Sequence, residues 1–369
     1  MKLIYLTSKK FPSAKADPFY VKSMAGAFNE LLGQDFLFLV RGNVPDELKR
    51  INTMSAPLPR RFRVVLYFFY MPILFILHGW SKKEIVFLSY DPYLLSILIF
   101  WRQAFGFKYS VCSDWHQLFG DWRDKYVAKH SDYLTTTSQR LKRLLTSVCG
   151  VDQDKIMVAY GGVDKNLFNN KSKTNKLEYR RMLGLPKDMF LVGYIGAFKS
   201  IGQEKGISTM IKALPPLSDN IKMAFIGGSA QQISEYTALL EELGVKERCI
   251  FVGWQTPEKA IEYEMAMDIL VIPYPDKPHF RDYGFPMKVW EYMASGRPII
   301  YSNLEIMREV LGGRATSFQP DDASSFANAV LSIYQDAESA EEIARKNTND
   351  VQAYTWKARA ENILNFIQT

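Results

Sequence analysis

The chain has 369 residues, a length that favours two domains or one large one. Hydrophobic residues make up 47% of it and charged residues 23%, which excludes an intrinsically disordered chain. The net charge of +7 is unevenly distributed, because residues 1–180 hold 27 basic and 15 acidic side chains (net +12) and residues 181–369 hold 19 and 24 (net −5). The basic half predicts an anionic membrane surface or a phosphate-bearing substrate as its partner. No nucleic-acid-binding motif accompanies it, so nucleic acid is not an expected partner.

In the first half, short apolar runs alternate with segments of helical periodicity. We predict parallel strands, buried on both faces, at residues 3–6, 36–40, 85–88 and 109–111, and helices at residues 21–32 and 140–147. The N-terminal run MKLIYLTSKK is interpreted as the first strand and not as a signal peptide, because its apolar part is short and further lysines follow it. This alternation predicts a doubly wound α/β domain.

An apolar run at residues 64–77, rich in aromatic residues, interrupts this pattern. Basic residues flank it, namely Arg60, Arg61 and Arg63 before it and Lys82 and Lys83 after it. It is shorter than the ~20 residues that span a bilayer, and Pro72 lies inside it. Two interpretations stay open: a buried core helix, or a helix in the membrane interface with its arginines on anionic headgroups. The second gives a cytoplasmic protein that binds peripherally to the inner face of the membrane.

The alternation starts again after residues 169–176, a polar and basic segment with the composition of a linker. Further strands are predicted at residues 190–195, 222–226, 250–252, 269–272 and 298–301, and helices at residues 206–214, 233–243 and 286–294. The predicted architecture is therefore two doubly wound, Rossmann-like domains that face a cleft. They cover residues 1–170 and 177–350, and a C-terminal helix within residues 351–369 packs back on the first domain.

Cysteine and histidine show no metal-binding pattern. The three cysteines, Cys112, Cys149 and Cys249, are too few and too scattered for a disulfide framework or a zinc site, and we interpret them as reduced thiols. The four histidines, His78, His116, His130 and His279, lack HxxxH or HExxH spacing. No Asp-x-Asp pair occurs at a strand end near the predicted cleft. We therefore expect no metal and no other cofactor.

The segment RDYGFPMKVWEYMASGRP (residues 281–298) lies between two predicted strands. A glycine-containing loop there opens a helix, and its free N–H groups and positive helix end favour a bound anion. Lys288 adds a cation in the first turn, and Glu291, one turn further on, is suited to bind the two hydroxyls of a ribose. An isolated motif of this kind is more often a capping loop with a surface glutamate.

A second motif with the same character precedes it in the chain. Residues 193–199 (GYIGAFK) end the first strand of the second domain, and Lys205 and Gly206 open the next helix. Either Lys199 or Lys205 alone is more often a solvated surface charge. Two such motifs at the carboxyl ends of parallel strands together favour a phosphate-binding site.

The order of motifs along nearly the whole chain resembles the retaining glycosyltransferases of the GT-B fold, specifically glycosyltransferase family 4 (glycosyl transferases group 1). The family pattern NGVD...F is matched by residues 161–164 with Phe168, and the donor pattern GR...KG by residues 196–197 with residues 205–206. The patterns F.G, aDi.v.Ps and P.K.wEYMa.G.P are matched by residues 251–253, 267–273 and 286–298.

Three positions depart from the family pattern. Tyr283, with Asp282 beside it, stands at the first glutamate of the usual E-x7-E pair. Ala197 stands where an arginine is usual, and Lys199 or Arg281 would have to supply that charge. Residues 13–17 (SAKAD) replace a glycine-rich loop.

The resemblance implies a UDP- or GDP-linked sugar on the second domain and a glycan, glycolipid or lipid-linked acceptor on the first. The donor-binding residues it implies are Gly196, Lys199, Lys205, Gly206, Arg281, Asp282, Tyr283, Gly284, Phe285, Pro286, Met287, Lys288 and Glu291, with Gly253 and Trp254 at the nucleotide base. The residues to which it gives catalytic roles are His116, Lys205, Lys288 and Glu291. The lysines and helix amides would stabilise the departing diphosphate without a protein nucleophile.

His116 follows the strand predicted at residues 109–111, and it resembles the histidine that lies near the donor sugar in this family. His78 and His130 are interpreted as structural, and His279 as a residue close enough to Arg281 to line the cleft.

Two other classes of function stay open from the sequence. One is a nucleotide-sugar epimerase on the same fold, which needs acid and base residues across the cleft and is disfavoured by the small number of histidines. The other is a catalytically silent sugar-binding or scaffold protein, suggested by Ala197 and Tyr283.

Overall fold

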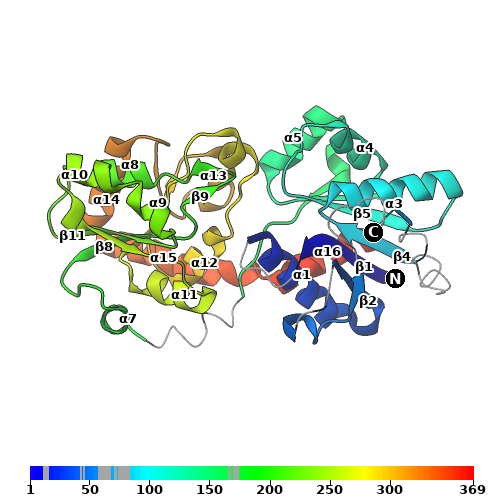
Figure 1. Ribbon diagram of the computed structural model, residues 1–369, viewed down its shortest axis with the longest axis horizontal. Helices are drawn as coiled ribbons and strands as arrows, with labels where there is room; N and C mark the ends of the chain where they lie inside the picture. The colour runs from blue at the N-terminus through cyan, green and yellow to red at the C-terminus, as the bar shows by residue number, and fades with distance from the viewer. Residues whose placement is uncertain are drawn as a thin grey trace. The chain divides into compact units, whose positions relative to one another are not determined.

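Figure 1 shows the computed structural model, which describes residues 1–10, 16–41, 44, 46–56, 68–69, 73, 84–164, 168 and 174–369. The chain forms two compact units. The first consists of Met1–Gly161 together with Trp356–Thr369, and the second of Gly162–Thr355. The break between the units at Gly161 and Gly162 precedes the segment 169–176 that we predicted to be a linker, most of which lies outside the described residues.

The first unit is built on a parallel seven-stranded sheet in the order β3-β2-β1-β4-β5-β6-β7. Its strands are β1 (Lys2–Lys10), β2 (Phe36–Arg41), β3 (Thr53–Ala56), β4 (Ile85–Ser89), β5 (Ser110–Trp115), β6 (Tyr133–Thr136) and β7 (Ile156–Val158). Its helices are α1 (Ala16–Leu32), α3 (Pro92–Phe105), α4 (Trp122–His130), α5 (Gln139–Cys149) and α16 (Trp356–Gln368). Every residue of β4 is buried, as expected for a strand that is covered on both faces.

Local sequence sets where these helices begin. Asp91 caps α3 through a hydrogen bond from the Tyr93 N–H, and Pro92 occupies the first helical position, where its missing N–H costs nothing. Ser138 caps α5 in the same way by accepting a hydrogen bond from the Leu141 N–H.

The last helix of the chain, α16, belongs to the first unit. It packs against α1, so that two helices far apart in the sequence lie side by side (Figure 1). Trp356 at the start of α16 contacts the rings of Phe19 and Tyr20 in α1, and Lys357 forms an ion pair with Glu30 of the same helix.

The second unit is built on a parallel six-stranded sheet in the order β12-β11-β8-β13-β14-β15. Its strands are β8 (Phe190–Ile195), β11 (Ile221–Ile226), β12 (Cys249–Val252), β13 (Ile269–Ile272), β14 (Ile299–Ser302) and β15 (Thr316–Phe318). Its helices are α7 (Lys176–Leu183), α8 (Ile207–Lys212), α9 (Ala230–Ser234), α10 (Thr237–Glu242), α11 (Pro257–Ala266), α12 (Lys288–Ser295), α13 (Glu305–Leu311), α14 (Ala323–Gln335) and α15 (Ala337–Asp350). A hairpin of β9 (Lys199–Ser200) and β10 (Gln203–Glu204) follows β8.

The order of strands reverses once in each sheet, between β1 and β4 in the first unit and between β8 and β13 in the second. In open parallel sheets, ligands bind at the carboxyl ends of the strands at such a reversal, because the flanking loops diverge there. Two doubly wound α/β domains, as predicted, are thus confirmed, and each has one edge suited to a ligand.

The structure corrects one predicted helix and adds elements that the sequence pattern did not indicate. Residues 233–243 form no continuous helix, because α9 ends at Ser234 and α10 begins at Thr237. Strands β3 (TMSA), β6 (YLTT) and β15 (TSF) contain polar residues and so lack a continuous apolar run, and β7 has only three residues.

Most of the apolar run at residues 64–77 lies outside the described residues. Of the part that is described, Phe68 packs its ring against Phe100 and Trp101 of α3, and its carbonyl accepts a hydrogen bond from Trp101 Nε1 at 2.7 Å. Phe69 and Ile73 are exposed. No helix within the described ranges is long and apolar enough to cross a membrane.

Candidate functional site

Glycine turns follow β8, β11 and β12 at the carboxyl edge of the second sheet. Gly196 donates a hydrogen bond from its N–H to the carbonyl of Ile226 at 2.8 Å. Gly227 has a positive φ of 117°, and a Cβ on it would lie 2.5 Å from the carbonyl oxygen of Gly196. No residue with a side chain fits there without moving the neighbouring turn. Gly253 follows β12, and Trp254 beside it is 61% exposed. The backbone therefore lines this edge, so a ligand can approach it closely.

Gly206 brings the start of α8 against the end of β13. Its φ is +86°, and a Cβ on it would lie 1.8 Å from the carbonyl oxygen of Pro273, so this close approach requires glycine. Lys205 is consequently held at the strand reversal between β8 and β13, with Nζ 5.5 Å from the centre of the Tyr274 ring. Across the described part of the chain, no carboxylate lies within ion-pairing distance of Lys205 Nζ.

His279 lies beside Lys205. Burial, and then the charge of Lys205, lower the pKa of His279, so the imidazole is neutral at pH 7. Its Nε2 lies 3.4 Å from Ser200 Oγ in the hairpin. The structure thus brings Lys205 and His279 together although the sequence separates them widely.

Lys288 lies between two glutamates rather than facing a free site. Its Nζ is 2.9 Å from Glu264 Oε1 and 2.6 Å from Glu291 Oε2. Glu264 in α11 is fully buried. Burial alone would lower the pKa of Lys288, but Glu264 and then Glu291 raise it well above its ordinary value, so the amine is charged. Two carboxylates around one ammonium leave this cluster with a net negative charge.

The Lys288 cluster lies next to the first glycine turn. A Cβ on Gly196 would lie 3.8 Å from Lys288 Cε. The helix α12 begins at Lys288, with Met287 as its N-cap, and no side chain caps its first N–H groups. The Val289 and Trp290 N–H groups donate to the Pro286 and Met287 carbonyls at 3.2 and 3.1 Å, so the positive end of the helix dipole, and not free N–H groups, favours an anion here. Glu291 stands in the same first turn.

The loop before α12 has a compact conformation of its own. Residues His279–Tyr283 form a π-helical turn, and the Gly284 N–H closes it by donating to the His279 carbonyl at 2.7 Å. Arg281 forms ion pairs with Asp276 and Asp282, both at 3.3 Å. The charge of Arg281 is therefore shared between two carboxylates, and Asp282 is buried beneath it.

The remaining predicted residues of this loop have mixed environments. Phe285 stacks on Trp290, which stacks in turn on Tyr354, so its ring is part of the packing of α12. Tyr283 is half-buried, and Pro286 is buried at the start of the turn that leads into the helix.

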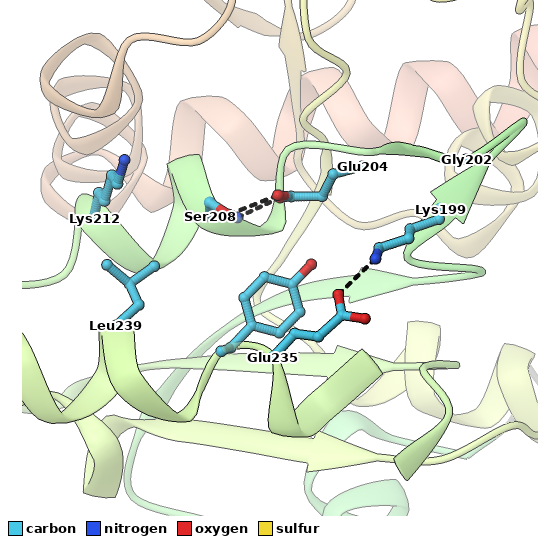
Figure 2. Close-up of a pocket in the computed structure, with 8 residues that line it drawn as sticks. Lys199, Gly202, Glu204, Ser208, Lys212, Glu235 and Leu239 are labelled. Carbon is cyan, nitrogen blue, oxygen red and sulfur yellow. Dashed lines mark hydrogen bonds and ion pairs between the residues drawn. The ribbon is translucent and has the colours of Figure 1, made fainter. Parts of the chain in front are cut away.

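Lys199 points into a separate hollow of about 450 Å³ between the hairpin, α8 and α10, where it forms an ion pair with Glu235 at 2.5 Å (Figure 2). Glu204 accepts hydrogen bonds from the N–H and hydroxyl of Ser208 in the same hollow (Figure 2). Because Lys199 is engaged there, the structure gives no contact by which it replaces the arginine missing at Ala197.

In the first unit, His116 directly follows β5, at the carboxyl edge of the sheet. Its ring lies between Tyr20, with ring centres 4.4 Å apart, and Tyr90, at 5.5 Å. Its Nε2 is 3.2 Å from Asp114 Oδ2. Tyr90 follows β4, so His116 lies near the strand reversal of its own sheet.

Sequence reasoning missed four residues that hold these groups in place. They are Glu264 beside Lys288, Tyr292 beside the end of β8, and Asp114 and Arg359 behind His116. The Tyr292 hydroxyl accepts a hydrogen bond from the Ile195 N–H at 3.1 Å, which ties α12 to the strand before Gly196.

Comparison with known proteins adds independent information. Residues 190–336 match the family model described as glycosyl transferases group 1. An uncharacterized glycosyltransferase of Methanocaldococcus jannaschii is 26% identical over 236 residues, which cover 62% of this chain and 58% of the relative. The D-inositol 3-phosphate glycosyltransferase of Corynebacterium glutamicum is 24% identical over 250 residues, which cover 65% and 58%. The chain thus spans less than two thirds of the length of these curated relatives.

Among solved structures, that of HepE from Anabaena in complex with UDP superimposes with a TM-score of 0.80 at 15% identity and covers 100% of both chains. At this identity the likeness establishes the fold, which is the GT-B arrangement of two Rossmann-like domains. The matched family segment runs from the start of β8 to the end of α14 and so contains Lys205, Lys288 and Glu291. The similarity to the glycosyl transferases group 1 family therefore lies in residues 190–336 of the second unit.

Proposed function

We propose that this protein is a retaining glycosyltransferase that moves a hexosyl group from a nucleotide-diphosphate sugar to a glycan, glycolipid or lipid-linked acceptor. The observation that carries the proposal is the carboxyl edge of the second sheet. There the glycine turns, the uncapped start of α12 and Lys205 converge at the strand reversal. The positive end of α12 and Lys205, for which the described residues provide no carboxylate partner, suit a diphosphate. The solved structures of HepE with UDP and with UDP-glucose support a UDP-linked donor.

In the proposed reaction, the bond between the sugar carbon and the diphosphate oxygen breaks while a bond to the acceptor hydroxyl oxygen forms on the same face. The proton of that hydroxyl passes to a departing diphosphate oxygen. Lys205 and the positive end of the α12 dipole stabilise the negative charge that develops on the diphosphate. Glu291 binds the ribose hydroxyls, and the paired Lys288 holds Glu291 in position. His116 is assigned a contact with a hydroxyl of a sugar substrate.

A thermal-shift panel of UDP-, GDP- and ADP-sugars tests donor binding directly. A ligand at 100 times its Kd stabilises the folded protein by about 2.7 kcal/mol, so the preferred donor is expected to raise the melting temperature most. We expect the UDP-sugars to do so. Analysis of the products then separates the activities: free UDP or a glycoside indicates transfer, and an isomerised donor indicates an epimerase. A melting temperature that none of these nucleotide sugars changes would contradict the proposed donor site.

We predict that activity needs no divalent metal. The residues that the structure describes include no cluster of three or more histidine, cysteine or acidic side chains placed to hold a metal ion. A lysine and helix amides can provide the electrostatic stabilisation that a metal provides in other enzymes. Turnover is expected to be the same with excess EDTA and with Mg²⁺. Complete loss in EDTA that Mn²⁺ or Mg²⁺ restores would contradict this prediction.

We also propose that the first unit binds anionic membranes. Phe69, Ile73 and Phe105 are exposed. Arg60, Arg61 and Arg63 precede the first two in the sequence, and each basic residue at an anionic surface adds about 1 kcal/mol. The wild type is expected to sediment with phosphatidylglycerol vesicles at low salt. It should be released as salt screens the charges, which at 0.1 M occurs over ~10 Å.

Replacing the three arginines with glutamine should release the protein from these vesicles. A variant with glutamine at Lys246, Lys259 and Lys346, which lie in the second unit, loses the same charge and should still bind. A wild-type protein that stays in the supernatant even at low salt would rule out the membrane interaction.

A further inference from the structure

A buried ion pair lies directly behind His116. The carboxylate of Asp114 at the end of β5 is 2% exposed, and the Arg359 guanidinium that it meets is 1% exposed. Arg359 Nη2 lies 2.8 Å from Asp114 Oδ1 and 3.1 Å from Oδ2. Thr135 Oγ1 donates to Oδ1 at 2.7 Å, and the Tyr20 hydroxyl donates to Oδ2. The carboxylate is thus held from four directions, with His116 as the fourth partner.

Arg359 comes from the other end of the chain. It stands on α16, whereas Asp114 stands on β5, 245 positions earlier. Its Nη1 donates to the carbonyl of Tyr160 at 3.0 Å, and its Nη2 also donates to the Tyr20 hydroxyl at 2.9 Å. One side chain of the last helix therefore joins β5, α1 and the segment at which the chain leaves the first unit.

The contact with Asp114 determines how His116 presents its ring. Burial alone would raise the pKa of Asp114, but Arg359 and then His116 lower it well below its ordinary value, so the group is a carboxylate. A carboxylate only accepts hydrogen bonds, so Nε2 of His116 carries the proton in this contact. In the neutral ring, Nδ1 is then the acceptor. The side chain keeps 29% of its surface exposed, whereas Asp114 behind it is buried.

We propose that Arg359 is a positioning residue for His116: by neutralising and fixing Asp114, the last helix holds His116 in its Nε2–H form with Nδ1 available as an acceptor. The inference rests on the proposed function for its catalytic meaning, because a sugar hydroxyl would be the group that donates to Nδ1. Its structural part concerns only the first unit and is measured without any substrate.

The other ionisable groups around the His116 ring carry no charge that could set its tautomer in place of Asp114. Tyr5 on β1 and Tyr20 on α1 are buried, which raises the pKa of both hydroxyls well above the ordinary value, and Cys112 on β5 is a buried thiol with a raised pKa. These three groups are neutral at pH 7. Tyr90 flanks the other face of the ring through its aromatic surface. Asp114 and Arg359 are thus the charged pair behind His116.

Nitrogen-15 NMR of the imidazole rings tests the proposal on the free protein. The chain has only four histidines, and His116→Gln identifies the signal. We expect wild-type His116 to be a single Nε2–H tautomer when neutral. In Arg359→Gln, the unneutralised Asp114 should draw a second proton onto the ring, so that more of His116 is doubly protonated at the same pH. Asp114→Asn should instead mix the two neutral tautomers, because an amide both donates and accepts.

Two variants separate this effect from a loss of folding. Lys357→Gln removes the exposed ion pair of α16 with Glu30 and should leave the His116 signal unchanged. If Arg359→Gln does not fold, Arg359→Lys keeps the charge without the forked contact and should give a smaller change of the same kind. An Nδ1–H tautomer in the wild type, or a His116 signal unchanged in either folded Arg359 variant, would overturn the proposal.

The catalytic part has its own readout. Arg359→Gln or Arg359→Lys should bind UDP with the wild-type Kd in calorimetry, because the donor site belongs to the second unit. Its turnover should fall on the order of 10²-fold through misplacement of His116. Wild-type turnover in a variant whose His116 signal has changed would show that Arg359 positions His116 through Asp114 but that this positioning does not affect catalysis. A wild type that neither binds UDP nor turns over would contradict the proposed function alone.

Discussion

Replacing Lys205 with alanine is expected to lower kcat for sugar transfer by about 10²- to 10³-fold, the effect of removing one group that stabilises charge in a transition state. Lys205 is the cation at the strand reversal for which the described residues provide no carboxylate partner, so a departing diphosphate is the charge that it can neutralise. Its removal leaves the Gly206 contact with Pro273 in place, and the melting temperature should hardly change.

Steady-state kinetics with the preferred donor, and single-turnover measurements, check this result. Lys212→Ala is the matched control, because Lys212 is an exposed lysine at the end of α8, the helix that begins directly after Lys205 and Gly206. It should keep wild-type kinetics. A Lys205→Ala enzyme with wild-type kcat/KM would assign the stabilisation of the diphosphate to the backbone alone.

Glu291→Ala is expected to lose most turnover by weakening donor binding. A charged hydrogen bond to ribose is worth about 1.5–3 kcal/mol, which corresponds to roughly 10- to 150-fold in kcat/KM. Glu291→Gln should retain more activity, since it keeps an acceptor. A loss that is equal for ribose and 2′-deoxyribose donors would argue that Glu291 acts through Lys288 and not on the ribose.

The second large effect concerns stability. Lys288→Met should destabilise the second unit by about 3–5 kcal/mol, because the fully buried Glu264 is left charged without its partner. The double variant Glu264→Gln, Lys288→Met should recover most of this loss, since it leaves no unpaired buried charge. Lys259→Met, which removes the surface pair with Glu262 on the same helix α11, should cost about 0–1 kcal/mol.

Denaturant unfolding followed by circular dichroism measures these differences. The pKa of Lys288 is higher in the folded state than in the unfolded chain, so its contribution is fully present below the unfolded value of about 10.4 and disappears only as the pH rises through the folded value. The contribution of Lys288 itself should therefore be constant across neutral pH, and any decrease of the loss at lower pH would come from protonation of the unpaired Glu264. A loss of less than about 1 kcal/mol would indicate that water reaches Glu264.

Much of the fold follows from local sequence. Strands 190–195 and 269–272 coincide with β8 and β13 because a parallel strand that is covered on both faces needs a continuous apolar run, and such runs are visible without any partner. Ser138 begins α5 because a side-chain cap acts within three residues. The helix predicted at 233–243 was wrong because periodicity does not reveal the break between α9 and α10.

In the candidate site, too, the sequence indicated the features that adjacent residues define and not those that depend on packing. Gly196, Lys205, Gly206 and the start of α12 were identifiable because a glycine turn and a helix start are properties of adjacent residues. Glu264 was not, because the sequence does not say which charge a buried lysine meets until the helices carrying them are packed.

The sequence by itself thus determined two doubly wound domains, the glycine and lysine motifs for which we propose phosphate binding in the second, and His116 as a candidate at a strand end. Only the tertiary structure decided that Lys288 is paired with Glu264 and Glu291, while the described residues give Lys205 no carboxylate partner. It alone joined Arg359 to Asp114 across 245 positions. The physical reason is that hydrophobic pattern and backbone conformation are local, whereas the energy of a buried charge depends on which distant side chain comes within hydrogen-bond distance of it.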